Sequence, residues 1–514
     1  MRENVDRNHQ GQEIFSGMFK RPLKKGSATT TTTVLFIIVL FIGAFISVGW
    51  INVSFSGASN QKVEASLESI HKHSHRVEIP LNCSAGKQTR TCPAKNFSLT
   101  FQKAEDHDRS SSSSPVCPDY FRWIHEDLRP WKETGITKEM VERAKKTANF
   151  RLVIVNGRAY VETLSKAFQT RDVFTLWGIL QMLNRYPGKL PDLELMFDLV
   201  DWPVLLARDY QGPNATAPPP LFRYCGADWS MEIVFPDWTF WGWPEVHIKP
   251  WEYLLKKLKE GNKRTTWNDR EPYAYWKGNP EVALTRQELM KCNVSDKQDW
   301  NARLYKQDWV RETQEGFNQS DLSRQCTHRY KIYIEGCSWS VSQKYILACN
   351  SVTLLVTPKY YDFFTRTLQP IHHYWPIRDD DKCRSIKFAV DWGNRHKQKA
   401  QAIGKAASEF IQEDLKMDYV YDYMFHLLNE YGKLLKYKPT IPENATELCP
   451  EVIACPAEGL EKEYMMDSRV NAIEDTSPCT MPPPFDPASL KDLQRRKSNS
   501  IQQVELWEKE SGGS

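Results

Sequence analysis

The stretch that decides the fold is KIYIEGCSWSVSQKYILACNSVTLLVTP, residues 331–358. It predicts a strand at 331–335, a tight turn at Gly336, a helix at about 340–349 and a second strand at 351–357. Two strands joined by one helix form a parallel βαβ unit, because a parallel pair needs a long crossover connection. The unit favours an α/β architecture, in which ligands bind at the carboxyl ends of the strands.

The segments on either side also alternate between strand and helix patterns. Asn156-Gly157 is a preferred dipeptide for a two-residue hairpin turn, and the runs around it alternate in the way that strands do. We expect strands at 151–155, 158–162 and 193–200 and helices at 172–185, 400–416 and 419–435.

The composition limits the class of protein. The 514 residues include 68 basic and 64 acidic side chains, and 41% of the residues are hydrophobic. These values are typical of globular domains and exclude wholesale disorder, collagen and a multi-span membrane protein. The near balance of charge argues against nucleic acid as the main partner. The 18 Trp residues are unusual, because flat aromatic faces pack in cores and also stack on sugars or bases.

One segment is apolar enough to span a membrane. Residues 34–51 read VLFIIVLFIGAFISVGWI, and 18 uncharged residues are long enough for a spanning helix. Basic side chains outnumber acidic ones in the residues before it, which favours a cytoplasmic N-terminus. We therefore predict a cytoplasmic tail at 1–33, a signal anchor at 34–51 and a single-pass type II membrane protein.

Glycosylation motifs and cysteines agree with this topology. All seven Asn-X-Ser/Thr motifs and all 12 cysteines follow the apolar segment. An even number of cysteines fits disulfides in an oxidising lumen, and their pairing cannot be deduced from the sequence. The chain ends in EKESGGS without a KDEL-type signal. We expect a Golgi membrane rather than the endoplasmic reticulum.

Two segments have the composition of irregular structure. Residues 52–115 are rich in Lys, Glu, Ser and glycosylation motifs without periodicity, and we expect a solvated stem there. Regular structure should begin near Cys117. Pro, Glu, Ser and charged residues dominate 441–514, so we expect a loose C-terminal tail.

The turn GCSWS at 336–340 is the first candidate site. It leads into the start of a helix, where free N–H groups and the helix dipole favour an anion such as phosphate. Hydroxyls of Ser338, Ser340 and Ser342 can donate further hydrogen bonds, and Lys344 lies one turn into the helix. The alternative is that Ser340 only caps the helix.

Asp201 and an aromatic run are two further candidates. Asp201 directly follows a buried strand, and a carboxylate there can take a proton from a hydroxyl group. The alternative for Asp201 is a structural turn. The run FPDWTFWGWP at 235–244 can stack on a sugar ring or form a packed loop.

Asp379, Asp380 and Asp381 have a spacing that suits a divalent cation. Their context, RDDDK, is typical of an exposed charged turn. Zinc has no support, because the sequence contains no CxxC or HExxH motif.

Five separated motifs occur in the order found in one family. They are LPDLELMFDLVDWP at 190–203, FPDWTFWGWP at 235–244, YAYWKG at 273–278, YKIYIEGCSWSVSQKYILACNSV at 330–352 and FIQEDLKMDYVYDYM at 410–424. Over about residues 116–440 the chain resembles glycosyltransferase family 90, which includes the Rumi-type protein O-glucosyltransferases and the fungal capsule-associated xylosyltransferases. It looks most like the plant branch.

The resemblance implies a GT-B fold, in which two Rossmann-like lobes face a cleft. An N-terminal, acceptor-side lobe would occupy 116–262, and a C-terminal, donor-binding lobe with closing helices would occupy 263–440. The implied reaction is inverting transfer of glucose or xylose from a UDP-sugar to a glycan or glycoprotein hydroxyl, without a metal or other cofactor.

The resemblance also implies residue roles, with Asp201 as the catalytic base. Donor-binding positions fall on Lys277, Gly278, Arg286, Gly336, Cys337, Ser338, Trp339, Ser340, Val341, Ser342 and Lys344. Acceptor-side positions fall on Trp202, Trp238, Phe240 and Trp241. About eight of the 18 Trp residues should line or border one cleft.

The chain departs from the pattern of the animal members, which have Arg at the positions of Val200, Lys277 and Ser342. Arg binds a diphosphate with two parallel donors, whereas Lys is a point charge and Ser is neutral. Lys344 or Arg286 would have to compensate. Two alternatives therefore stay open. One is a glycoside hydrolase that uses Asp201 with Asp237, and the other is a non-catalytic glycan-binding or scaffolding protein.

Overall fold

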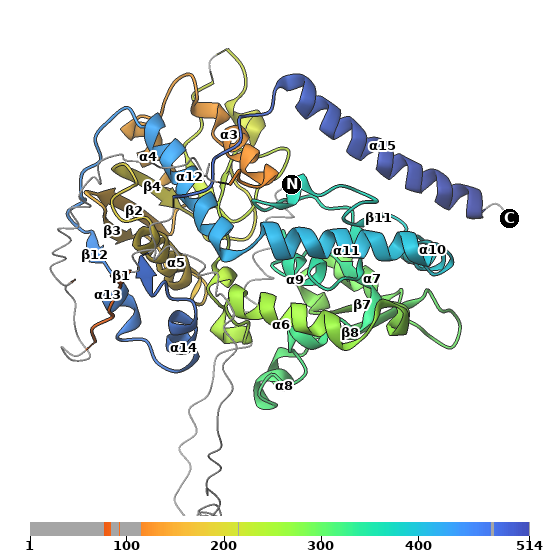
Figure 1. The fold of residues 1–514 in the computed structure, drawn as a ribbon. Coiled ribbons are helices and arrows are strands. Elements are labelled where there is room, and N and C mark those ends of the chain that lie inside the picture. Colours follow the sequence, from red (N-terminus) through yellow and green to blue (C-terminus); the bar gives the residue numbers. More distant parts are fainter. Residues whose placement is uncertain (1–76, 84–91, 93–114, 214, 474–476, 513–514) are drawn as a thin grey trace, which may run out of the picture. The chain divides into compact units, whose positions relative to one another are not determined.

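The computed structural model describes residues 77–83, 92, 115–213, 215–473 and 477–512 (Figure 1). All of them belong to a compact unit that spans residues 75–514. No helix within these residues is long and apolar enough to cross a membrane. The cytoplasmic tail and signal anchor predicted for 1–51 lie outside the described residues.

The first sheet is mixed and has six strands in the order β12-β3-β2-β4-β5-β6. Its strands are β2 (Phe150–Val155), β3 (Arg158–Thr163), β4 (Leu193–Phe197), β5 (Leu221–Arg223), β6 (Ile233–Val234) and β12 (Thr446–Leu448). Asn156 and Gly157 have φ angles of 51° and 72°, the left-handed values that a tight turn between β2 and β3 requires. The predicted hairpin is confirmed.

The second sheet has five strands, all parallel, in the order β11-β10-β9-β7-β8. They are β7 (Glu271–Gly278), β8 (Ala302–Lys306), β9 (His328–Tyr333), β10 (Val352–Val356) and β11 (Trp375–Ile377). β9 and β10 pair in parallel on either side of α9 (Gln343–Leu347), so the predicted βαβ unit is confirmed with a shorter helix. The carboxyl ends of these strands therefore share one edge.

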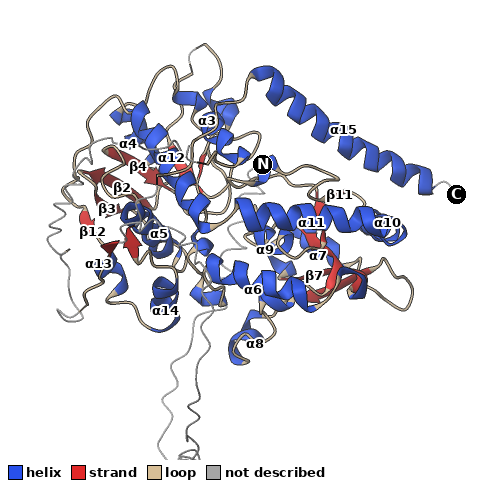
Figure 2. Ribbon diagram, in the orientation of Figure 1, coloured by secondary structure: helices blue, strands red, loops and turns tan. Residues whose placement is uncertain are grey.

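Helices cover both sheets (Figure 2). The longer ones are α5 (Arg171–Arg185), α6 (Trp251–Arg264), α10 (Lys382–Arg395), α11 (Lys397–Asp414) and α12 (Met417–Leu434). α12 packs against α5 and β4, and the hydroxyl of Tyr431 donates to the carbonyl of Glu194 at 2.9 Å. α5 needs Gly178, because a Cβ there would lie 2.4 Å from the Trp241 ring.

The C-terminal segment is folded, so the loose tail predicted for 441–514 is wrong for its described residues. They form β12, α13 (Pro450–Ala454), α14 (Gly459–Asp467), β13 (Ala472–Ile473) and α15 (Pro487–Gly512). β12 extends the first sheet beside β3. α15 buries Val504 in the core around the second sheet, and its Trp507 stacks on Trp392 with ring centroids 6.1 Å apart. The sequence prediction missed these anchoring residues because most of the residues around them are polar.

Three disulfides join this segment to the N-terminal residues of the compact unit. They are Cys83–Cys455, Cys92–Cys449 and Cys117–Cys479. β1 (Val77–Glu78) also pairs antiparallel with β13. The described parts of the predicted 52–115 stem therefore belong to the compact unit. Cys292–Cys383 and Cys326–Cys349 complete the disulfides of the described residues.

Truncating the anchor of α15 should destabilise the protein. Val504 is 1% exposed, so Val504→Ala removes buried apolar area and should lower the free energy of unfolding by about 2 kcal/mol. Gln503→Ala changes an exposed neighbour and should stay within about 0.5 kcal/mol of the parent. Urea unfolding followed by Trp fluorescence compares them. Equal stability of the two variants would mean that α15 is not docked.

Candidate functional site

The carboxyl edges of the two sheets meet at a short backbone bridge. Gly226, which lies shortly after β5, and Tyr361, which follows β10, each donate an N–H to the other's carbonyl at 2.9 Å. A Cβ at position 226 would lie 2.7 Å from the Tyr361 ring, so glycine is what permits this approach. Loops that follow strands of both sheets are thereby placed against each other.

A buried arginine at the end of β5 fixes the loop that contains Asp201. The Arg223 guanidinium pairs with the Asp198 carboxylate and donates to the carbonyls of Trp202 and, at 3.1 Å, Val200. Burial raises the pKa of Asp198, and the charge of Arg223 opposes that rise. The backbone on both sides of Asp201 is therefore held from one side chain.

The Asp201 carboxylate is partly exposed and is held by a second arginine. Nη1 of Arg171 lies 2.5 Å from Oδ1 of Asp201 and 3.0 Å from the carbonyl of Leu199. The Arg171 guanidinium is buried and lies over the rings of Trp238, at 4.5 Å, and Phe168, at 5.1 Å. This arrangement orients the carboxylate by one oxygen and leaves Oδ2 able to accept a proton.

The sequence interpretation did not find Arg171. One signal was available, since Arg171 is the first residue of α5, and a cation is unfavourable at a helix N-terminus. Its position implies a specific anionic partner, and Asp201 is that partner.

The 336–342 turn contacts the Asp201 loop directly. The Ser338 hydroxyl donates to the backbone carbonyl of Asp201 at 2.5 Å, and the Cys225 thiol donates to the same carbonyl at 3.0 Å. The structure therefore brings together two sites that the sequence places 137 residues apart. The Asp201 loop and the turn therefore meet beside the Gly226–Tyr361 bridge.

Within the turn, the serines differ in their surroundings. Ser340 and Ser342 are half-buried with their hydroxyls 2.9 Å apart, and the Ser340 N–H donates to Tyr333. α9 begins at Gln343 and has five residues, and its N-cap, Ser342, makes no side-chain capping bond. An anion at the turn would therefore be bound by the hydroxyls and not by the dipole of a long helix.

The other residues of the turn are mainly structural. The Trp339 indole is buried beside Tyr224, with ring centroids 5.8 Å apart, and Val341 is half-buried. Cys337 is also half-buried; its thiol donates to Val282, and burial raises its pKa to about 11. Gly336 closes the turn by donating its N–H to Ser338 at 2.9 Å.

Arg286 donates hydrogen bonds to the backbone next to the turn. Its Nε donates to the Glu335 carbonyl at 2.8 Å, its Nη2 to Ile334 at 3.1 Å and its Nη1 to Asn279 at 3.3 Å. Burial lowers its pKa to about 10. At least three of its N–H groups thus bind backbone, which supports a positioning role more than the predicted contact with a ligand.

Lys344 does not face the site, and its predicted contact with a ligand is wrong in this conformation. Its ammonium is 3.1 Å from Oδ2 of Asp237 and 2.8 Å from the Thr239 hydroxyl, and both charged side chains are at most 4% exposed. This buried pair fastens α9 to the aromatic run. It also engages Asp237, which weakens the alternative of a two-carboxylate hydrolase.

Lys277 lies at the end of β7 and is paired with a carboxylate. Its ammonium is 2.9 Å from Oε1 of Glu312, in α8 (Trp309–Gln314), and 2.6 Å from the Gln319 carbonyl. Gly278 is required beside it, because a Cβ would lie 2.5 Å from the Trp276 ring. A ligand that uses Lys277 must compete with Glu312.

The aromatic run is a packed loop. Phe240 and Trp241 are fully buried, so their predicted acceptor contacts are wrong. Trp238 is also buried, but it contacts Arg171 and so acts on Asp201 indirectly. Trp202 is half-buried next to Asp201, and its acceptor-side role stays a prediction.

Only some of the eight Trp residues expected at one cleft are accessible. The five that are buried in the cores are Trp238, Trp241, Trp251, Trp276 and Trp339. Trp202, Trp229 and Trp243 keep some exposure. The high Trp content thus serves packing more than stacking on a ligand.

The acidic run is engaged in ion pairs. Oδ1 of Asp379 is 2.8 Å from Lys382, and Asp380 and Asp381 pair with Arg378. One cluster of potential metal ligands occurs among the described residues, at Cys117, His426 and Cys479. Its two sulfurs are joined in a disulfide and so are not thiolate ligands.

Glu335 is a buried carboxylate directly before the turn. It accepts the N–H groups of Lys359 and Tyr360 at 3.0 and 2.9 Å. Burial outweighs these bonds and raises its pKa to about 7. The protonation state of Glu335 therefore changes near neutral pH beside the turn.

Comparison with known proteins points to one family of glycosyltransferases. The family model described as Glycosyl transferase family 90 matches residues 112–508, which include most of the C-terminal segment. Protein O-glucosyltransferase 1 of Bos taurus and of Homo sapiens are each 25% identical over 360 residues, 66% of this chain and 86% of each relative. O-glucosyltransferase rumi of Drosophila melanogaster is 25% identical over 355 residues, 66% of this chain and 83% of that protein. These relatives are animal proteins, so assignment to the plant branch stays a prediction.

Glu335 should make stability depend on pH. Its pKa rises from 4.5 unfolded to about 7 folded, so the folded state binds the extra proton, and its contribution to stability is lost as pH rises from about 4.5 to 7. Glu335→Gln stays neutral, so its free energy of unfolding relative to the parent should increase by about 3 kcal/mol from pH 4.5 to 8. The exposed control Glu281→Gln should show no such trend. A difference for Glu335→Gln that is constant with pH would contradict the assignment.

Proposed function

The chain belongs to glycosyltransferase family 90, and from this premise we propose that it transfers glucose or xylose from a UDP-sugar to a hydroxyl group of a glycan or glycoprotein. The observation that carries the proposal is the contact between the Asp201 loop and the 336–342 turn. It joins the loop that carries the proposed base to the turn whose Ser340 and Ser342 hydroxyls we propose bind the diphosphate. The relatives named O-glucosyltransferases favour glucose among the two sugars.

In the proposed reaction, Oδ2 of Asp201 takes the proton of the acceptor hydroxyl as its oxygen attacks the anomeric carbon. A bond forms between that oxygen and the carbon, and the bond from the carbon to the β-phosphate oxygen breaks. The electron pair leaves with UDP, and the sugar inverts because attack and departure occur on opposite sides. Arg171 holds Oδ1 at 2.5 Å, which keeps the base aimed before the acceptor arrives.

Charge on the departing UDP needs donors in place before the reaction. Ser340 and Ser342 offer hydroxyls, and Lys277 is the cation that we propose turns from Glu312 to the diphosphate. Asp379 to Asp381 are engaged by Lys382 and Arg378, which supports transfer without a metal ion.

We also propose a GT-B architecture and a single-pass type II Golgi enzyme with a lumenal catalytic part. The two α/β sheets with facing carboxyl edges support the former. Five disulfides among the described residues support an oxidising compartment. The apolar segment at 34–51 supports the anchor.

Replacing the proposed base should separate binding from turnover. In the purified full-length chain, Asp201→Asn should lower the rate of UDP release from a panel of UDP-sugars by about 10²- to 10⁴-fold. The affinity for UDP, measured by calorimetry without metal, should change less than threefold. Asp209→Asn, at an exposed site, serves as the control. Unchanged turnover would refute the base, and absence of UDP binding to the parent would refute the donor class.

Removing the negative charge of Glu312, which competes with UDP for Lys277, should strengthen UDP binding. Glu312→Gln takes the charge from the partner of Lys277, so UDP should bind about three- to tenfold more tightly, which corresponds to about 0.6 to 1.4 kcal/mol. Lys277→Met should weaken UDP binding. Glu281→Gln frees Lys306 on the surface in the same way and should have no effect. Weaker binding by Glu312→Gln would show that the ion pair itself forms the site.

A further inference from the structure

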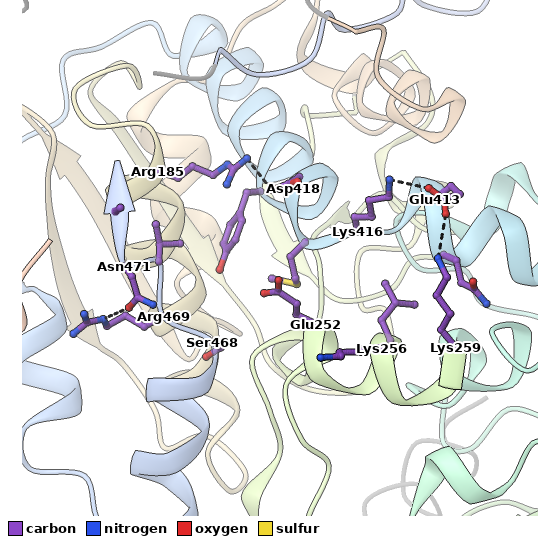
Figure 3. A pocket seen from close by; sticks show the side chains of 16 residues that line it. Arg185, Glu252, Lys256, Lys259, Glu413, Lys416, Asp418, Ser468, Arg469 and Asn471 are labelled. Atoms are coloured by element: carbon purple, nitrogen blue, oxygen red, sulfur yellow. Dashed lines mark hydrogen bonds and ion pairs between the residues drawn. The ribbon is translucent and has the colours of Figure 1, made fainter. Parts of the chain in front are cut away.

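A hollow lies at the C-terminal end of α5, away from Asp201 (Figure 3). Its volume is about 720 Å³, and it lies between the end of α5, α6, the junction of α11 with α12, and residues 468–472. α5 starts at Arg171, which binds Asp201, and ends at Arg185, which lines the hollow. A rise of 1.5 Å per residue puts these two ends about 21 Å apart. The hollow, which we call the α5–α6 groove, is therefore separate from the proposed active site.

One wall of the α5–α6 groove is fixed in place. The buried Trp177 indole donates to the Ser468 hydroxyl at 3.0 Å, and the buried Gln181 side chain accepts the Val470 N–H at 2.9 Å. β13 adds a backbone link to β1 directly after this wall. The groove thus has a preformed shape, as ligand sites usually do.

The groove has an excess of positive charge. Its cationic lining residues are Arg185, Lys256, Lys259, Lys416 and Arg469. Its acidic lining residues are Glu252, Glu413 and Asp418. Five cations against three carboxylates leave two positive charges, and the walls of a cleft concentrate their field.

The ion pairs in the groove can exchange partners with a ligand. Glu413 is shared, since it lies 2.8 Å from Lys416 and 3.7 Å from Lys259. Figure 3 shows both lysines reaching this one carboxylate. Exposed ion pairs of this kind contribute only about 0 to 1 kcal/mol. A ligand carboxylate can therefore take one lysine without a large cost to the fold.

We infer that the α5–α6 groove is a second binding site, and that its ligand is an anionic oligosaccharide. The charge excess selects an anion. The amide of Gln412 donates to Ser408 and that of Asn471 accepts from Arg469, which leaves the Gln412 oxygen to accept from a sugar hydroxyl and the Asn471 nitrogen to donate to one. Leu255 and Met417 give apolar surface for the sugar C–H faces. The choice of a saccharide over an acidic peptide rests on the proposed function, whereas the choice of an anion does not.

The site would bind a remote part of a long acceptor. The groove and the Asp201 edge lie at the two ends of α5, about 21 Å apart, so a chain that reaches both over the surface must be at least this long. Such tethering raises the local concentration of its reactive end. The inferred partner is thus a polymer with carboxylate-bearing sugars rather than a short neutral glycan.

The test measures binding of oligogalacturonides of six to ten residues to the full-length chain by calorimetry, without donor and with saturating UDP. We expect salt-sensitive binding that UDP does not block. Lys256→Glu with Lys259→Glu should weaken it at least tenfold and leave UDP affinity unchanged. The control Lys405→Glu reverses an exposed lysine of α11 outside the groove and should leave binding unchanged.

Three results would overturn the inference. They are no oligogalacturonide binding, an equal loss in the Lys405→Glu control, or tighter binding of a glutamate hexapeptide than of the oligogalacturonide. Asp201→Asn separates this inference from the proposed function, because it should lower turnover by about 10²- to 10⁴-fold and keep groove binding. Groove binding without UDP binding in the parent would support the site and refute the proposed donor.

Discussion

The buried guanidinium of Arg223 is the interaction on which the site depends. It neutralises Asp198 and holds the carbonyls of Val200 and Trp202 on both sides of Asp201, so it fixes the backbone from which the Asp201 side chain and carbonyl project. The same carbonyl receives Ser338 from the other sheet. Loss of one member of a buried pair typically costs about 3 to 5 kcal/mol. Here such a loss would release the proposed base and the contact between the two edges together.

The cations near the junction are divided between holding the fold and meeting a ligand. Lys344 ties α9 to the aromatic run through Asp237, and Arg286 ties β9 to its own turn. Neither can leave without exposing buried partners. Lys277, which we propose for the diphosphate, has a carboxylate partner on the short helix α8. If Lys277 binds the diphosphate as proposed, the affinity for the donor depends on how readily its ammonium leaves Glu312.

The sequence predicted what local patterns determine. The β9–α9–β10 unit and the hairpin at Asn156 follow from periodicity and turn chemistry, and parallel strands bring their carboxyl ends to one edge. It could not predict the burial of Lys344, because its partner Asp237 is 107 residues away. It also missed Arg171, whose role depends on a loop 30 residues later. α15 was missed because a few anchors, such as Val504, lie among charged residues that suggest disorder.

The long-range disulfides also set the order of events in the cell. Cys83, Cys92 and Cys117 pair with cysteines 357 to 372 residues further along the chain. At 5 to 20 residues per second, ribosomes need roughly 20 to 70 s to make that length. During this time the three N-terminal thiols have no native partner, while the strands that lie between the paired cysteines in sequence are being synthesised. These three disulfides can therefore form only after Cys449, Cys455 and Cys479 have been synthesised.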